Sequence, residues 1–148
     1  MDRKTIDKII QESQICHLSC CLDEVPYLIP ISFGYDGQAI YIHTAKRGKK
    51  ISIFENNPRV CLSFVSRADL IPDPDQACEW GFESSSVIAD GIISELIDPA
   101  EKVIALDLIM AHYSDREWDY PEKMLAATRT WKIILKDPTG KVASPDED

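Results

Sequence analysis

A cluster of positively charged side chains lies in the middle of an otherwise acidic chain, whose formal net charge is −9. The cluster consists of Lys46, Arg47, Lys49 and Lys50. It follows a strand-like run ending at His43-Thr44 and opens a helix that we predict over residues 48–56. A helix start attracts anions, because its first N–H groups are unpaired and the backbone dipole is positive there. The cluster therefore indicates either a phosphate site or a solvated helix start.

Cysteine and histidine side chains near the N-terminus have the composition of a metal site but not its geometry. We predict a strand over residues 14–22, in which successive side chains point to opposite faces. Cys16 and Cys20 would share one face, roughly 13 Å apart at about 3.3 Å per residue, while His17 and Cys21 face the other way. A zinc ion needs ligands that converge on one point at about 2.0–2.3 Å. We expect core or half-buried cysteines and no metal site.

No constellation typical of acid–base or nucleophilic catalysis is discernible in the sequence. The chain has three histidines, and no Ser/His/Asp set or pair of carboxylates surrounds any of them. Among them only His43 lies at a strand end beside a basic turn that contains glycine. The hydroxyls of Ser84-Ser85-Ser86 could point to a ligand or be ordinary strand side chains. We therefore assign no catalytic residue.

Length and composition predict one globular domain over residues 1–148. The low isoelectric point of about 4.8 argues against nucleic-acid and anionic-membrane partners. Five irregularly spaced cysteines suit a reducing compartment, and no apolar run approaches the length of a membrane span. We expect a cytoplasmic protein with a frayed acidic tail over residues 141–148.

The hydrophobic pattern predicts helices and strands that are joined mostly by hairpins. The predicted helices cover residues 2–13, 48–56, 99–113 and 121–127. The predicted strands cover residues 14–22, 25–35, 38–44, 59–66, 80–97 and 129–136. Residues 69–78 contain prolines and acids and read as an exposed loop. This order predicts a mainly β, α+β fold in which a six-stranded antiparallel sheet forms a small barrel with peripheral helices.

Several single residues refine that prediction. Pro26 and Pro30 indicate an edge strand or an irregular strand, because proline cannot donate to a β-ladder. Gly91 indicates a bulge or a close backbone approach within a long strand. The helix over residues 99–113 is apolar around much of its circumference, so it is either well buried or packed against another subunit.

These features, in this order, resemble the pyridoxamine 5′-phosphate oxidase-like FMN-binding split barrels. The resemblance rests on a strand ending in His43-Thr44, the Lys-Arg-Gly-Lys-Lys turn, and the run Glu55-Asn56-Asn57-Pro58-Arg59-Val60. Pro30-Ile31-Ser32-Phe33, His43 and Ser86-Val87 followed by Gly91 are most similar to the nitroimidazole-reductase (nitroimidazole-resistance) branch. The resemblance covers residues 6–96 and the last strand, and it implies a split β-barrel.

The resemblance also implies a cofactor and its contacts. It places the FMN phosphate against Lys49 and Lys50, with His43 and Thr44 lining the same end. The residues that it places along the isoalloxazine or in polar contact with the flavin are Pro30, Ile31, Ser32 and Ser86. Family members are typically homodimers that bind flavin between subunits, which would give the apolar helix a surface to cover.

The activity implied by the resemblance is that of an FMN-dependent oxidoreductase. It would take electrons from NAD(P)H and reduce a small acceptor such as a nitro-aromatic compound. Two alternatives remain open: a flavin-binding carrier or redox sensor without turnover, and a split barrel that binds haem, with His43 as an iron ligand, or a deazaflavin. Vitamin B6 oxidation is disfavoured, because the chain ends Lys136-Asp137-Pro138-Thr139-Gly140 and an acidic tail, without the arginine segment of the true oxidases. Lys49, where those oxidases prefer arginine, would also lose a bidentate phosphate contact.

Overall fold

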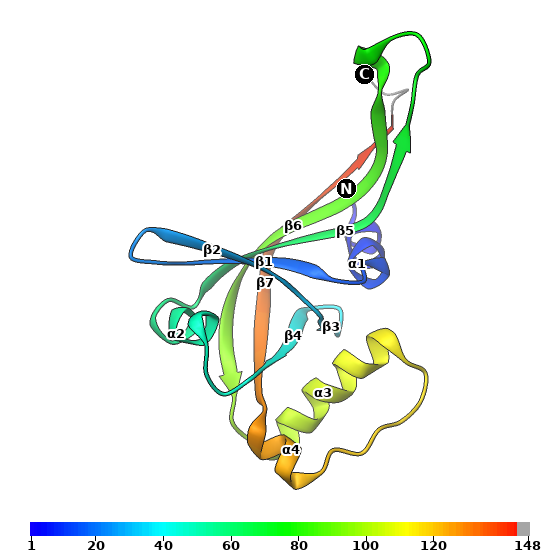
Figure 1. Ribbon diagram of the computed structural model, residues 1–148. Helices are drawn as coiled ribbons and strands as arrows, with labels where there is room; N and C mark the ends of the chain where they lie inside the picture. The colour runs from blue at the N-terminus through cyan, green and yellow to red at the C-terminus, as the bar shows by residue number, and fades with distance from the viewer. Residues whose placement is uncertain (145–148) are drawn as a thin grey trace.

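A single antiparallel sheet of seven strands dominates the computed structural model, which describes residues 1–144 (Figure 1). The strands are β1 (Cys16–Leu22), β2 (Val25–Ile31), β3 (Gly34–Tyr35), β4 (Ala39–Thr44), β5 (Arg59–Ile71), β6 (Gly81–Leu96) and β7 (Arg129–Ala143). Their order in the sheet is β2-β1-β5-β6-β7-β4-β3. The chain passes from β2 to β3 through Ser32 and Phe33, so the two outer strands are joined there and the sheet closes as a barrel. The predicted mainly β, α+β fold is confirmed.

Four α-helices surround the barrel, and all four were predicted. They are α1 (Arg3–Glu12), α2 (Lys49–Asn56), α3 (Pro99–Tyr113) and α4 (Glu122–Ala127), and a short 3₁₀ turn covers Ala77–Glu79. Asp2 caps α1 by accepting a hydrogen bond from the N–H of Thr5 at 2.8 Å, and Asp98 caps α3 by accepting from Ala100 at 3.4 Å. Among the described residues, no helix is both long and apolar enough to cross a membrane.

The hydrophobic core fills the barrel. Its largest fully buried side chains include Leu18, Phe33, Ile42, Leu62, Phe64 and Ile133. The buried faces of α1 and α2, which lie on opposite sides of the barrel in Figure 1, belong to the same core. A second, smaller cluster forms where α3 packs on β4 through Ala105, Leu106 and Ile109. Cys16 and Cys20 are buried, His17 is exposed and Cys21 is half-buried, which confirms the alternation predicted for β1.

The structure corrects three predicted boundaries. Residues 25–35 form two strands on opposite edges of the sheet, β2 and β3, so seven strands replace the predicted six. Strand β5 continues to Ile71 through the start of the predicted loop. Strand β7 continues to Ala143, so residues 141–143 are not part of a frayed tail; residues 145–148 lie outside the described part of the chain.

The extra length of β5, β6 and β7 forms an arm that projects from the barrel (Figure 1). In the arm Arg67 pairs with Ser85 and Ser84 pairs with Ala143. These pairings satisfy the backbone, while much of the arm's side-chain surface is exposed. A strand exposed on both faces carries no hydrophobic alternation, which is why the sequence pattern did not extend β5 and β7 into the arm. The predicted strand over residues 80–97 did include the arm's part of β6.

Two glycines allow close packing next to the barrel. A Cβ at Gly34 would lie 2.5 Å from the backbone N of Ile109, so only glycine lets α3 approach β3 this closely. A Cβ at Gly91 would lie 2.5 Å from Cγ2 of Ile133. This confirms the close backbone approach predicted at Gly91, next to a register shift between Ile88 and Asp90.

Candidate functional site

The barrel is split between β2 and the second half of β4. β3 pairs with β4 only at Ile40 and Tyr41, and β2 is the outermost strand on the other side of the sheet. The β3–β4 register, if continued, would place Ser32 opposite His43 and Ile31 opposite Thr44, since Gly34 lies opposite Tyr41. The described residues show no such pairing. Backbone groups of both strands are therefore left without strand partners at this point.

The start of α2 lies next to this split. The Lys49 ammonium sits 4.7 Å from the ring centroid of Tyr27 on β2, a cation–π contact across the split. The turn that precedes α2 leaves β4 directly after Thr44. The cationic turn, which we define as residues 45–50, thus connects one side of the split to the other.

The charges on α2 run against its backbone dipole. Lys49 and Lys50 occupy the positive N-terminal end and Glu55 lies in the negative last turn, with no acid in the first turn and no base in the last. Each misplaced charge costs roughly 0.3–1 kcal/mol at an exposed site. Gly48 provides no side-chain cap, and the N–H groups of Lys49 and Lys50 have no hydrogen-bond partner among the described residues. An anion at the helix start would stabilise this arrangement.

The cations of the turn are available to such an anion. Among the described residues, no carboxylate lies within ion-pairing distance of Lys46, Arg47, Lys49 or Lys50. The ring of His43 is nearby: desolvation, and then the positive charge of Lys50, lower the pKa of His43 from its ordinary 6.5. His43 is therefore neutral at pH 7 and can offer a hydrogen bond rather than a charge.

The free edge of β2 exposes mostly hydrogen-bond acceptors. Asp23 and Glu24 form a two-residue turn with positive φ, which makes its flanking residues exchange hydrogen bonds. Bonded positions then alternate along β2, so Pro26, Leu28 and Pro30 direct their backbone groups away from β1. Proline has no N–H, so this edge offers carbonyl oxygens at all three positions and an N–H only at Leu28. Such an edge resists pairing with another strand and suits a ligand that carries N–H donors.

The structure brings most of the predicted site residues together around the split. Pro30, Ile31 and Ser32 follow the β2 side, His43 is exposed on the β4 side, and Lys49 and Lys50 lie at the start of α2. The side chain of Thr44 is used inside the protein instead. Its hydroxyl accepts a hydrogen bond from Nε1 of Trp131 at 3.0 Å and donates to the carbonyl of Ala45 at 2.9 Å, so only its backbone is left for a ligand.

Ser86 lies far from this cluster within one chain. It pairs with Lys141 on β7, whereas His43 pairs with Thr130 on the same strand. The two positions differ by 141 − 130 = 11 residues, roughly 36 Å along a straight strand at about 3.3 Å per residue. Ser86 is at the base of the arm and does not face the cationic turn of its own chain.

Sequence reasoning missed the residues that hold the turn in place. Tyr27 contacts Lys49 of the turn and Trp131 contacts Thr44 just before it. Arg129 contacts the carbonyl of Lys46, 83 residues earlier in the chain. No periodicity or motif connects residues so far apart in the chain. The prolines of β2 were the one sequence signal, and they predicted the free edge correctly.

The comparison with known proteins identifies the family. A model of the pyridoxamine 5′-phosphate oxidase family matches residues 2–142. The chain belongs to this family. The resemblance stated from the sequence is thereby confirmed.

Two solved structures show how this member of the pyridoxamine 5′-phosphate oxidase family relates to others. A proposed 5-nitroimidazole antibiotic resistance protein from Bacteroides thetaiotaomicron VPI-5482 is 30% identical with a TM-score of 0.84, over 94% of this chain and 82% of that one. The FAD- and heme-binding protein from Mycobacterium smegmatis has a TM-score of 0.85 over 97% of this chain and 72% of that one. Its sequence identity of 18% shows the shared fold alone.

A curated relative matches a shorter stretch. Uncharacterized protein RA0666 of Rhizobium meliloti (strain 1021) is 29% identical over 68 residues, which are 46% of this chain and 44% of that protein. The match therefore spans less than half of the relative's length.

Proposed function

We propose that the split of the barrel binds FMN and that the protein is an FMN-dependent oxidoreductase. In this proposal the phosphate lies at the start of α2 and the isoalloxazine follows the free edge of β2. NAD(P)H supplies the electrons, and a small molecule such as a nitro-aromatic compound accepts them. The observation that carries the proposal is the reversed charge pattern of α2, which is stabilised when a phosphate occupies the helix start.

The residues around the split fit the two ends of the cofactor. Lys49 and Lys50 would bind the phosphate together with the unpaired N–H groups of the helix start. The carbonyl oxygens of β2 can accept from the N–H of the pyrimidine ring of a flavin, and the exposed ring of Pro30 offers an apolar contact. Neutral His43 can donate or accept one hydrogen bond at the same end.

The chain's own contribution to the reaction is binding and orientation. When bound, FMN supplies the redox chemistry by taking a hydride from a nicotinamide and passing electrons on. No side chain of this protein has to act as an acid, base or nucleophile, in keeping with a sequence that shows no catalytic set. Lys49 and Lys50 hold the phosphate end, and the β2 edge orients the ring and limits its contact with water.

A second copy of the chain would complete the site. Ser86 cannot reach the cationic turn of its own chain, so a flavin contact from Ser86 requires the turn of a partner chain. The exposed apolar side chains at the outer surface of the helical region, Ile97 at 73% and Ile104 at 57% exposure, would be covered in a homodimer. We therefore propose a homodimer with flavin at its interface.

The similar structures support a flavin as the ligand, and the reaction itself is left to the experiment. The M. smegmatis structure is that of a protein that binds FAD and heme, and the B. thetaiotaomicron structure is that of a proposed nitroimidazole resistance protein. A neutral His43 could also ligate a haem iron, so haem is the second candidate ligand.

An absorption spectrum of freshly purified protein tests the proposal. We expect flavin bands, or their appearance with a shifted spectrum after addition of FMN, and faster oxidation of NADH or NADPH than free FMN supports. A colourless protein that takes up no FMN would refute the proposal. A Soret band would favour haem, and bound FMN without faster turnover would favour a carrier or sensor.

A further inference from the structure

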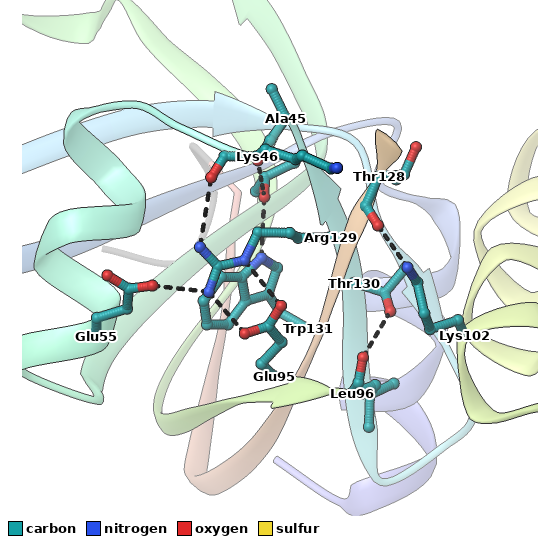
Figure 2. A network of polar contacts seen from close by, with 11 residues as sticks. Ala45, Lys46, Glu55, Glu95, Leu96, Lys102, Thr128, Arg129, Thr130 and Trp131 are labelled. Carbon is teal, nitrogen blue, oxygen red and sulfur yellow. Dashed lines mark hydrogen bonds and ion pairs between the residues drawn. The ribbon is translucent and has the colours of Figure 1, made fainter. Parts of the chain in front are cut away.

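Arg129, the first residue of β7, joins three parts of the chain at the cationic turn (Figure 2). Its guanidinium donates to Glu95 of β6 twice, from Nε at 2.8 Å and from Nη2 at 2.6 Å. Nη2 also donates to Glu55 of α2 at 2.8 Å. Nη1 points to the backbone carbonyl of Lys46, within the turn itself, at 3.4 Å. One side chain thus links β6, α2 and the turn.

This guanidinium is poorly suited to bind an anionic ligand itself. Its bidentate contact with Glu95 and its contact with Glu55 place two carboxylates on one positive charge, so the group as a whole is negative. The Arg129 side chain is only 20% exposed, and the guanidinium carbon lies 4.8 Å from the ring centroid of Trp131. Hydrogen bonding to Glu95 raises the pKa of Arg129 further above its ordinary value. Arg129 is therefore a fixed link between β6, α2 and the turn, and the two carboxylates compensate its charge. We call this side chain the strut.

The turn is held from β7 at successive residues. Trp131 Nε1 donates to Thr44 Oγ1, and that hydroxyl donates to the carbonyl of Ala45. Arg129 reaches the next carbonyl, that of Lys46, as Figure 2 shows. Through Glu55 the same arginine fixes the far end of α2. The helix start and the turn before it are therefore fixed relative to the barrel at both ends.

The start of β7 is itself anchored by the helices. Lys102 of α3 donates to the backbone carbonyls of Leu125 and Thr128. Figure 2 shows the contact with Thr128, which directly precedes Arg129. Lys102 thus adds a second hydrogen bond to the Leu125 carbonyl, which also accepts from the N–H of Thr128 at 3.4 Å, and gives the Thr128 carbonyl a partner. Lys102 therefore holds the backbone directly before Arg129 in place.

We propose that Arg129 is a positioning residue for the phosphate end of the site. It keeps the first N–H groups of α2 and the ammonium groups of Lys49 and Lys50 aimed at one point, without touching the ligand. This inference rests on the proposed function. Because positioning of the phosphate end does not concern the flavin ring, loss of the strut weakens FMN binding more than binding of riboflavin, which has no phosphate.

The experiment measures Kd for FMN and for riboflavin by fluorescence quenching, in the wild-type chain and in the variants R129Q, R129K and E55Q. The quantity compared is the ratio of the riboflavin Kd to the FMN Kd. The matched control is R67Q, because Arg67 also joins two carboxylates, Asp69 and Glu83, but lies on the arm. We expect the ratio to fall tenfold or more in R129Q and R129K, since lysine cannot hold three partners at once, and to stay unchanged in R67Q.

The sign of the E55Q effect separates positioning from simple electrostatics. Removing the negative charge of Glu55, whose side chain is 52% exposed, makes the region more positive and by charge alone would favour FMN. If Glu55 instead anchors Arg129 to α2, its loss should lower the ratio of the riboflavin Kd to the FMN Kd. E55Q also keeps the test valid if R129Q does not fold, because it alters an exposed side chain.

Each outcome is decisive. A lower ratio in E55Q and in the Arg129 variants, with R67Q unchanged, supports the positioning role. An unchanged or higher ratio in E55Q, or an equal fall in R67Q, overturns that role while leaving the proposed function intact. If the wild-type protein binds FMN no more tightly than riboflavin, the phosphate site itself fails and the role of Arg129 fails with it.

Discussion

Replacing Lys50 by glutamine should stabilise the free protein and weaken FMN binding. Lys50 is a cation in the first turn of α2, where a positive charge costs roughly 0.3–1 kcal/mol. For a protein of this size that is a rise in Tm of about 1–4 °C at low salt. Loss of one charge-assisted contact to the phosphate costs about 1.5–3 kcal/mol, a roughly 10- to 150-fold increase in the FMN Kd.

Thermal unfolding of the apoprotein and titration with FMN and riboflavin measure these two effects. Lys4 is the matched control, because it is the second residue of α1, as Lys50 is of α2, and is fully on the surface. We expect K4Q to raise Tm in the same direction and to leave the FMN Kd unchanged. We also expect K50Q to raise the pKa of His43 in an NMR titration, since the charge of Lys50 lowers it.

The reasoning is refuted if K50Q binds FMN as tightly as the wild type. It is equally refuted if K50Q weakens riboflavin and FMN to the same extent, because the contact would then not concern the phosphate. The stability difference should shrink as ionic strength rises towards about 1 M, where the Debye length is only about 3 Å.

Three further predictions concern the scaffold of the site. Gly34→Ala should destabilise the protein by about 1–3 kcal/mol in urea unfolding, since its Cβ would press on the backbone of α3. Burial alone would raise the pKa of Asp36, but its hydrogen bonds, including that from Tyr41, lower this pKa below 3.8. The loss of stability in Asp36→Asn should therefore appear above pH 3.8 and vanish as the pH falls through the lowered pKa. Thr44→Val should cost about 1–3 kcal/mol by leaving the Trp131 N–H unpaired, whereas Thr44→Ser should keep that hydrogen bond and most of the stability.

Local signals in the sequence predicted most of the fold. The hydrophobic pattern along the chain predicted all four helices and most of the strands. The single predicted strand over residues 25–35 was wrong because nothing local distinguishes a continuous strand from one that crosses to the other edge of the sheet. The parts of β5 and β7 in the arm were missed for a related reason, since strands that are exposed to solvent on both faces have no alternation to detect.

The site residues were predictable from the sequence only where they are neighbours along the chain. The cationic turn and the start of α2 are neighbours in sequence, so their charges and spacing indicated an anion site. The buried role of the Thr44 hydroxyl depends on Trp131, and the strut depends on Arg129 meeting Glu55 and Glu95. Such contacts arise from strand order, which the sequence pattern specifies only in outline.

The most direct test of the central claim is a crystal structure of the protein soaked with FMN. The account predicts the phosphate at the start of α2, within hydrogen-bonding distance of Lys50 and the N–H of Lys49, and the flavin ring along the edge of β2. A flavin whose phosphate points to solvent, or one bound away from the split while Lys49 and Lys50 contact nothing, would contradict it.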